Sequence, residues 1–68
     1  MSARERKAAL VLRGITGAHL ARELEVSEQQ VSQVLRGFRR SPRVEAAIAA
    51  AIGKPVGRVF PAVERRVA

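Results

Sequence analysis

The sequence lacks most of the residues from which metal sites and catalytic centres are built. Its 68 residues include no cysteine, no aspartate and a single histidine, and there is no glycine-rich phosphate loop. Disulfides and thiolate zinc sites are therefore excluded, and we expect neither a metal nor any other cofactor. The carboxylates are scattered glutamates, so we also expect that the protein is not an enzyme.

Long apolar segments are missing as well. The longest unbroken run, from Ala46 to Ile52, is far shorter than the ~18 residues that a membrane-spanning helix needs. The basic residues near the N-terminus are followed by an apolar stretch that is too short for a secretory signal. We therefore expect a cytoplasmic protein that has no membrane contact.

Positive charge is what the sequence has in excess. Thirteen lysine and arginine residues stand against six acidic residues, which gives a formal charge of +7 and an isoelectric point near 11.8. This charge density indicates a polyanionic partner. Nucleic acid and an anionic membrane both fit the charge alone, so the arrangement of the basic residues has to distinguish them.

Capping and breaking residues divide the chain into short helical segments, and no segment shows the apolar alternation of a strand. The predicted N-caps are Ser2 (with Glu5 in a capping box), Thr16, Ser27 and Ser41, and the predicted helix ends lie at Gly14, Leu24, about Arg36 and Gly53. A last short helix follows Pro55. The predicted fold class is all-α: a compact domain of four to five helices over residues 1–61, followed by a tail, residues 62–68, without a clear signal.

Apolar residues at helical spacing predict which side of each helix faces the core. The predicted core residues are Val31, Val34 and Leu35 in the third helix, Val44, Ala47, Ile48 and Ala51 in the fourth, and Val56, Val59 and Phe60 at the end. A chain this short can bury only a modest core.

Residues 16–37 have the steric features of a helix-turn-helix. Ala21 is small where two helices must approach closely, Leu24 and Val26 flank the turn, and Val31 and Val34 fill the angle between the helices. An ordinary αα-hairpin is the alternative interpretation. The outer face of the third helix favours the interpretation as a DNA-binding helix-turn-helix.

That outer face is rich in side chains that can read bases. With the valines turned inward, Gln29, Gln33 and Arg36 centre on the opposite side of the helix. Glutamine can pair with adenine, arginine with guanine, serine with either, and glutamate can accept a hydrogen bond from cytosine. The predicted base-reading residues are Glu28, Gln29, Gln30, Ser32, Gln33 and Arg36. The alternative for the whole face is that it is polar only because it is exposed to solvent. The alternative for Glu28 is that it supports the start of the helix.

Arginines surround the start of the fourth helix. Backbone amides at a helix start are expected to be free to bind an anion, so these arginines and amides together predict a phosphate clamp, with a solubility patch as the alternative. The predicted phosphate-binding residues are Thr16, Arg22, Ser27, Arg39, Arg40, Ser41 and Arg43. Two interpretations are open for the basic residues Arg4, Arg6 and Lys7: they are an arm that contacts DNA, or they are the exposed face of the first helix. We assign no role to His19.

The motif resembles that of the lambda-repressor-like and Cro-like regulators of bacteria and their phages. The positions that match are Leu20-Ala21, Leu24, Val26-Ser27, Val31, Val34 and Gly37, and the resemblance covers residues 4–60. In size the chain resembles the small Ner-like phage regulators. The resemblance implies a phosphate contact at the start of helix four and a short fifth helix that closes the domain.

Two positions depart from the family pattern. Glu25 stands where the family usually has a glycine with a positive backbone angle, which costs about 1 kcal/mol for a glutamate. Gly17 stands where many members have a glutamine that binds the DNA backbone.

The sequence thus predicts a sequence-specific, double-stranded DNA-binding transcriptional regulator associated with the nucleoid. We expect a repressor of phage or mobile-element genes that occupies an operator and needs no small-molecule ligand. A homodimer on a palindromic operator is expected, because one module buries only ~600 to 1,000 Å² on DNA. Leu12, Val63 and Val67 are candidate dimer contacts. The alternatives are an architectural, excisionase-like accessory protein and an antitoxin-like protein-interaction module.

Overall fold

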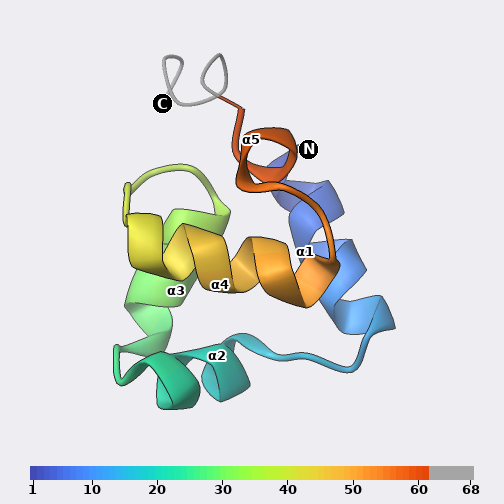
Figure 1. Ribbon diagram of the computed structural model, residues 1–68. Helices are drawn as coiled ribbons and strands as arrows, with labels where there is room; N and C mark the ends of the chain where they lie inside the picture. Colours follow the sequence, from blue (N-terminus) through green and yellow to red (C-terminus); the bar gives the residue numbers. More distant parts are fainter. Residues whose placement is uncertain (62–68) are drawn as a thin grey trace.

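The computed structural model describes residues 1–61, which form five α-helices and contain no strand. The helices are α1 (Ala3–Leu12), α2 (Gly17–Leu24), α3 (Glu28–Leu35), α4 (Pro42–Ile52) and α5 (Val56–Val59). Figure 1 shows α4 crossing the middle of the molecule, with α3 near its start, α1 near its end, α2 below and α5 above. The prediction of an all-α domain is confirmed.

Each of the four longer helices begins at the residue predicted to cap it. The hydroxyl oxygens of Ser2, Thr16, Ser27 and Ser41 accept hydrogen bonds from the amides of Glu5, His19, Gln30 and Val44, at 3.1 to 3.5 Å. The amide of Ser2 also donates to Oε1 of Glu5 at 2.8 Å, which completes the predicted capping box. Local hydrogen bonds to side chains therefore determine where these helices start.

The same four helices end in one common way. Beyond each last turn an amide bonds to the carbonyl five residues earlier, a Schellman motif. The four bonds, at 2.9 to 3.1 Å, run from Ile15 to Leu10, from Val26 to Ala21, from Phe38 to Gln33 and from Lys54 to Ala49. The residue just before each donor has a positive φ, as predicted for Gly37.

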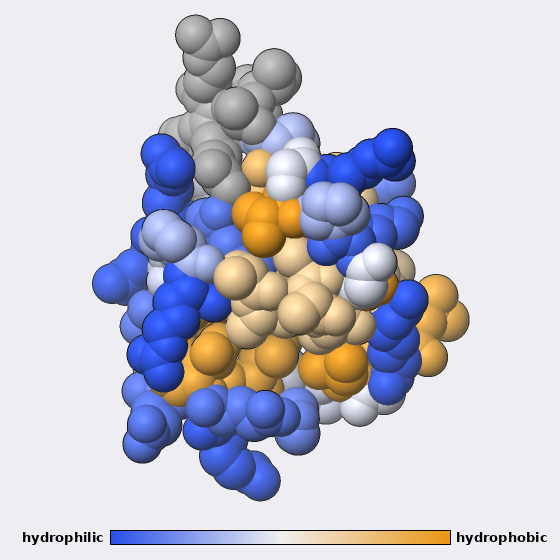
Figure 2. Space-filling view, viewed as in Figure 1, coloured by the Kyte–Doolittle hydropathy of each residue, from blue (hydrophilic) through white to orange (hydrophobic). Residues whose placement is uncertain are grey.

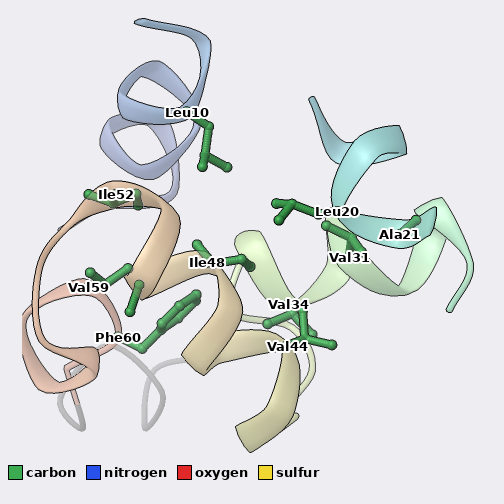
Figure 3. Packing of buried hydrophobic residues seen from close by; sticks show 11 residues of the cluster. Leu10, Leu20, Ala21, Val31, Val34, Val44, Ile48, Ile52, Val59 and Phe60 are labelled. Atoms are coloured by element: carbon green, nitrogen blue, oxygen red, sulfur yellow. The ribbon is translucent and has the colours of Figure 1, made fainter. Parts of the chain in front are cut away.

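The hydrophobic core surrounds α4, which contacts each of the other four helices. Its buried apolar residues are Leu10, Leu20, Ala21, Val31, Val34, Val44, Ile48, Ala49, Ile52, Val59 and Phe60. Figure 3 shows that their side chains come from all five helices and point toward a common centre.

Four residues of the predicted core are less buried than expected, although Leu35 and Ala51 still pack against it. Ala47 and Ala51 are only half-buried, whereas Ala49 and Ile52 fill the core. The buried side of α4 is broader than the predicted stripe because a central helix packs on more than one side. Leu35 is also only half-buried, and Val56 is 36% exposed, so Val59 and Phe60 close the core at α5.

Arg6 is buried in this core, together with Glu45. Nε of Arg6 donates to the Leu35 carbonyl at 2.7 Å, and Nη1 donates to the carbonyls of Met1 and Val59 at 2.6 and 2.8 Å. The guanidinium also lies 4.5 Å from the centre of the Phe60 ring. Both interpretations offered for Arg6, an arm on DNA and an exposed face, were therefore wrong. The side chain joins α1 to the end of α3 and to α5.

Candidate nucleic-acid interface

The turn between α2 and α3 has the geometry that a helix-turn-helix requires. It consists of three residues, Glu25, Val26 and Ser27. Glu25 has φ 58° and ψ 43°, so the predicted left-handed conformation at this position is confirmed. Ala21 is buried on α2 and Val31 is fully buried on α3, which allows the two helices to pack closely across the short turn.

The outward side of α3 is polar along its whole length. Val31 and Val34 are fully buried, whereas Glu28, Gln29 and Arg36 are exposed and Gln30, Ser32 and Gln33 are half-buried. The helix therefore presents the side chains that the sequence singled out. Their contacts with bases stay a prediction.

An open groove separates α3 from α1 and from the start of α2. Its polar lining includes Glu28, Gln29, Ser32 and Arg36 from α3 and its C-cap, Thr16 from the N-cap of α2, and Arg4 and Lys7 from α1. The groove thus brings three cationic side chains together with one carboxylate, that of Glu28. Gln30 and Gln33 do not line it.

A second group of cationic side chains follows the C-terminal end of α3 in the chain. Arg39 and Arg40 are exposed in the loop between α3 and α4, and Arg43 is exposed in the first turn of α4. None of them lines the groove. Basic side chains therefore occupy two places next to α3, the groove beside α1 and the loop before α4.

The sequence matches the winged helix-turn-helix DNA-binding family over residues 1–65. The chain belongs to this family. The protein is thus a helix-turn-helix DNA-binding domain, and double-stranded DNA is its partner. Residues 1–61 contain no strand. Neither the curated proteins nor the solved structures yield a match to the chain.

The start of α4 in this helix-turn-helix domain differs from the predicted anion site. The amide of Val44 donates to the Ser41 hydroxyl at 3.5 Å, and the amide of Ser41 donates to Oε2 of Glu45 at 3.3 Å. Pro42 has no amide proton. The prediction that the amides are free to bind an anion was therefore wrong for Ser41 and Val44.

The remaining predicted phosphate contacts lie at helix ends. The hydroxyls of Thr16 and Ser27 accept cap hydrogen bonds, which leaves their protons able to donate to a phosphate. Arg22 is exposed in the last turn of α2. His19 pairs with Glu23 one turn along the same helix.

Arg4 and Lys7 are the site residues whose role the sequence left open. Arg6 lies four residues before the core residue Leu10, on the same side of α1, and both are buried. Arg4 and Lys7 face the groove instead. Helical spacing from Leu10 separates Arg6 from Arg4, but it does not separate Arg6 from Lys7, which lies three residues before Leu10.

Within residues 1–61, no helix has the length and hydrophobicity to cross a membrane. The same residues hold no group of three or more histidine, cysteine, aspartate or glutamate side chains placed to bind a metal ion.

Proposed function

We propose that this helix-turn-helix domain is a sequence-specific transcriptional regulator that represses genes by occupying an operator. The observation that supports the proposal most directly is the polar outer side of α3, which has cationic side chains in the groove beside it and in the loop that follows it. A helix with this composition presents donors and acceptors to base edges, while the cations beside it suit the phosphates of a duplex.

In this proposal α3 is the recognition helix and lies in the major groove. Gln29, Gln33 and Arg36 contact base edges near the centre of the helix face, and Gln30 and Ser32 contact bases at its margins. Glu28 accepts a hydrogen bond from a cytosine or supports the helix start. These contacts are the source of sequence preference.

The phosphates are bound at both sides of the recognition helix. Arg39, Arg40 and Arg43 contact one strand from the loop before α4, with the hydroxyl of Ser41 beside them. On the other side, Arg4 and Lys7 contact a phosphate across the groove. Thr16, Arg22 and Ser27 add contacts from α2 and the turn. All of these interactions position the protein without reading sequence.

We further propose a homodimer on a palindromic operator, and genes of a phage or mobile element as the target. The similarity to lambda-repressor-like regulators supports the target. A second module supports tight binding because it doubles the base contacts. Leu12, which is 86% exposed beside the 65% exposed Val11, offers apolar surface for the dimer contact. Val63 and Val67 lie outside the described residues.

Selection of bound sequences from a random duplex pool tests the proposal. The expected result is a palindrome whose half-site centres are about 10 base pairs apart, or a multiple of that spacing. A reporter gene placed behind the selected sequence should then be expressed less when the protein is present. Enrichment of no sequence, combined with tight binding to one acidic protein, would overturn the proposal in favour of a protein-interaction module.

A further inference from the structure

Phe38 is an exposed aromatic side chain fixed to the end of α3. Its ring is 72% exposed, whereas the other aromatic residue of the chain, Phe60, is 3% exposed. The Phe38 amide donates to the Gln33 carbonyl at 3.0 Å, and the Gly37 amide donates to the Val34 carbonyl at 3.0 Å. Because this Schellman motif holds the backbone, the ring has a fixed origin relative to the outer side of α3.

The same motif buries its apolar residue elsewhere in the chain. Ile15 after α1 and Val26 after α2 stand in the position of Phe38, and both pack against the core. Their amides bond to the carbonyls of Leu10 and Ala21, which have apolar side chains. In α3 the corresponding residue is Gln33, so Phe38 finds no apolar partner at that position.

The surroundings of Phe38 indicate what covers its ring. Arg36, Arg39 and Arg40 are close to it in the chain, and all three are exposed. Like charges at this density oppose a second copy of the same surface and favour a polyanion. The charge around Phe38 therefore favours DNA over a second copy of the chain as the partner of this surface.

We propose that Phe38 contacts the 5-methyl group of a thymine beside the bases that α3 reads. This methyl is the apolar group that base pairs present in the major groove, and phenylalanine is one of the side chains that contact it. Phe38 is thereby a specificity-determining residue. The inference rests on the proposed function, because it requires α3 to lie in the major groove.

Removing the methyl groups tests this contact directly. The affinities of the wild-type protein and of Phe38→Ala are measured by fluorescence anisotropy on the selected duplex, and on the same duplex with deoxyuridine in place of every thymidine. We expect the wild-type protein to lose about fivefold or more in affinity on the uracil duplex. On the thymine duplex, Phe38→Ala should bind more weakly than the wild type by a similar factor. Its affinity for the uracil duplex should be little lower than its affinity for the thymine duplex.

Two further variants serve as controls for the same measurement. Val56→Ala removes an apolar side chain from the surface of α5 and should bind as the wild-type protein does on both duplexes. Phe38→Leu keeps an apolar side chain and should retain part of the preference for thymine. Circular dichroism of Phe38→Ala should show an unchanged fold, because the ring is exposed.

The outcomes separate this inference from the proposed function. If the wild-type protein selects no sequence, the proposed function is wrong. If it selects a sequence, two results would show that the thymine contact alone is wrong. One is that Phe38→Ala binds as tightly as the wild type, and the other is that Phe38→Ala loses the same factor in affinity on the thymine and uracil duplexes. A change from dimer to monomer in Phe38→Ala, seen by sedimentation without DNA, would equally overturn the contact with DNA.

Discussion

At the scale of single residues, the guanidinium of Arg6 joins three segments behind the recognition helix. The Leu35 carbonyl that it binds belongs to the last turn of α3, where carbonyls have no partner within the helix. The Val59 and Met1 carbonyls that it also binds come from α5 and the chain start. Arg6 thus donates hydrogen bonds to one buried and two partly buried backbone carbonyls.

We expect Arg6→Ala to lower the free energy of unfolding by roughly 3 kcal/mol or more. Each buried carbonyl left without a donor costs ~1 to 3 kcal/mol, and the missing side chain leaves a cavity beside Phe60. Arg6→Lys should recover only part of the loss, because an ammonium cannot reproduce the fork of a guanidinium. Urea unfolding followed by circular dichroism measures both variants. Arg4→Ala, on the exposed side of the same helix, is the control, and a loss for Arg6→Ala no larger than for Arg4→Ala would refute the structural role.

Glu25 carries the backbone strain of the turn. Its φ of 58° is a conformation that glycine adopts without a clash between Cβ and the backbone. We expect Glu25→Gly to be neutral or to stabilise the protein by up to ~1 kcal/mol, because relief of the clash competes with the greater chain entropy of glycine in the unfolded state. Glu23→Gly, within α2, should instead destabilise by about 1 kcal/mol. If a thermal melt shows the same fall in melting temperature for both variants, Glu25 is not strained.

The burial of Arg6 and Glu45 could not be predicted from residue type. Charged side chains are almost never fully buried unless they are paired, so composition alone places both at the surface. The hydrogen bonds that offset the cost of burying Arg6 come from α3, α5 and the chain start, which are far apart in the sequence. The strain at Glu25 was predicted from the resemblance, because the family usually has a glycine at this position.

At the scale of helices, the bounds of α1 to α4 followed from the sequence because they depend on local chemistry. Ser2, Thr16, Ser27 and Ser41 each bond to an amide three residues later, and neither partner needs a contact from elsewhere in the fold. The buried side of α4 was less predictable. It depends on how many helices surround α4, and helical spacing within α4 does not contain that information.

The capping box of α1 makes its stability depend on pH. Hydrogen bonds from the backbone amide of Ser2, and then from its side chain, hold the pKa of Glu5 below the ordinary value of 4.5. A folded-state pKa below the unfolded one adds stability above pH 4.5, which is lost as the pH falls through the folded-state value. We expect Glu5→Gln to melt at a lower temperature than the wild type at pH 7, and the difference between the two proteins to shrink as the pH falls below 4.5. A difference that persists in acid would show that the carboxylate charge is not responsible.

Substitutions in the recognition helix should distinguish residues that read bases from residues that only position the protein. Gln29→Ala or Gln33→Ala is expected to weaken binding to the selected sequence by roughly 1 to 3 kcal/mol and to leave binding to random duplexes nearly unchanged. The reason is that glutamine pairs with a base edge, and random duplexes offer the correct edge rarely. Anisotropy titrations on both duplexes measure the difference. Equal losses on the two would mean that these glutamines contact the backbone.

At the scale of the whole molecule, positive charge is distributed unevenly around the fold. Arg4, Lys7 and Arg36 line the groove beside α3, and Arg39, Arg40 and Arg43 are exposed before and at the start of α4. Figure 2 shows a pale orange, apolar surface over the middle of the molecule, where α4 carries its alanines. This stretch of α4, with Ala46 and Ala50 exposed, offers no cation to a phosphate.

Only part of this distribution was predictable from the sequence. Arg39, Arg40 and Arg43 are neighbours along the chain, so their grouping next to the recognition helix could be inferred directly. Arg4 and Lys7 are far from α3 in sequence, and they meet it across the groove only because α1 packs against α3 and α4. Long-range packing of this kind leaves no local pattern.

The dependence of binding on salt should distinguish the two cationic groups from the rest of the charge. Each phosphate contact releases counterions and steepens the fall of log affinity with log salt by about 0.9. We expect the triple variant with Arg39, Arg40 and Arg43 changed to alanine to flatten this slope by up to ~2.7, and the double variant with Arg4 and Lys7 changed to alanine by up to ~1.8. The losses should be the same on selected and random duplexes, because phosphates are alike at every base step.

A matched variant decides whether contact or net charge causes these changes. Lys54 and Arg58 are exposed at and before α5, outside the groove and the loop, and replacing both by alanine removes the same charge as the Arg4 and Lys7 variant. If phosphates are bound where we propose, the Lys54 and Arg58 variant should keep nearly the full slope, because charges beyond about 10 Å are screened at 0.1 M salt. Anisotropy across a salt series measures all three proteins. An equal slope for both double variants would mean that α1 contributes only to the long-range field, and an unchanged slope for the triple variant would mean that the loop faces away from DNA.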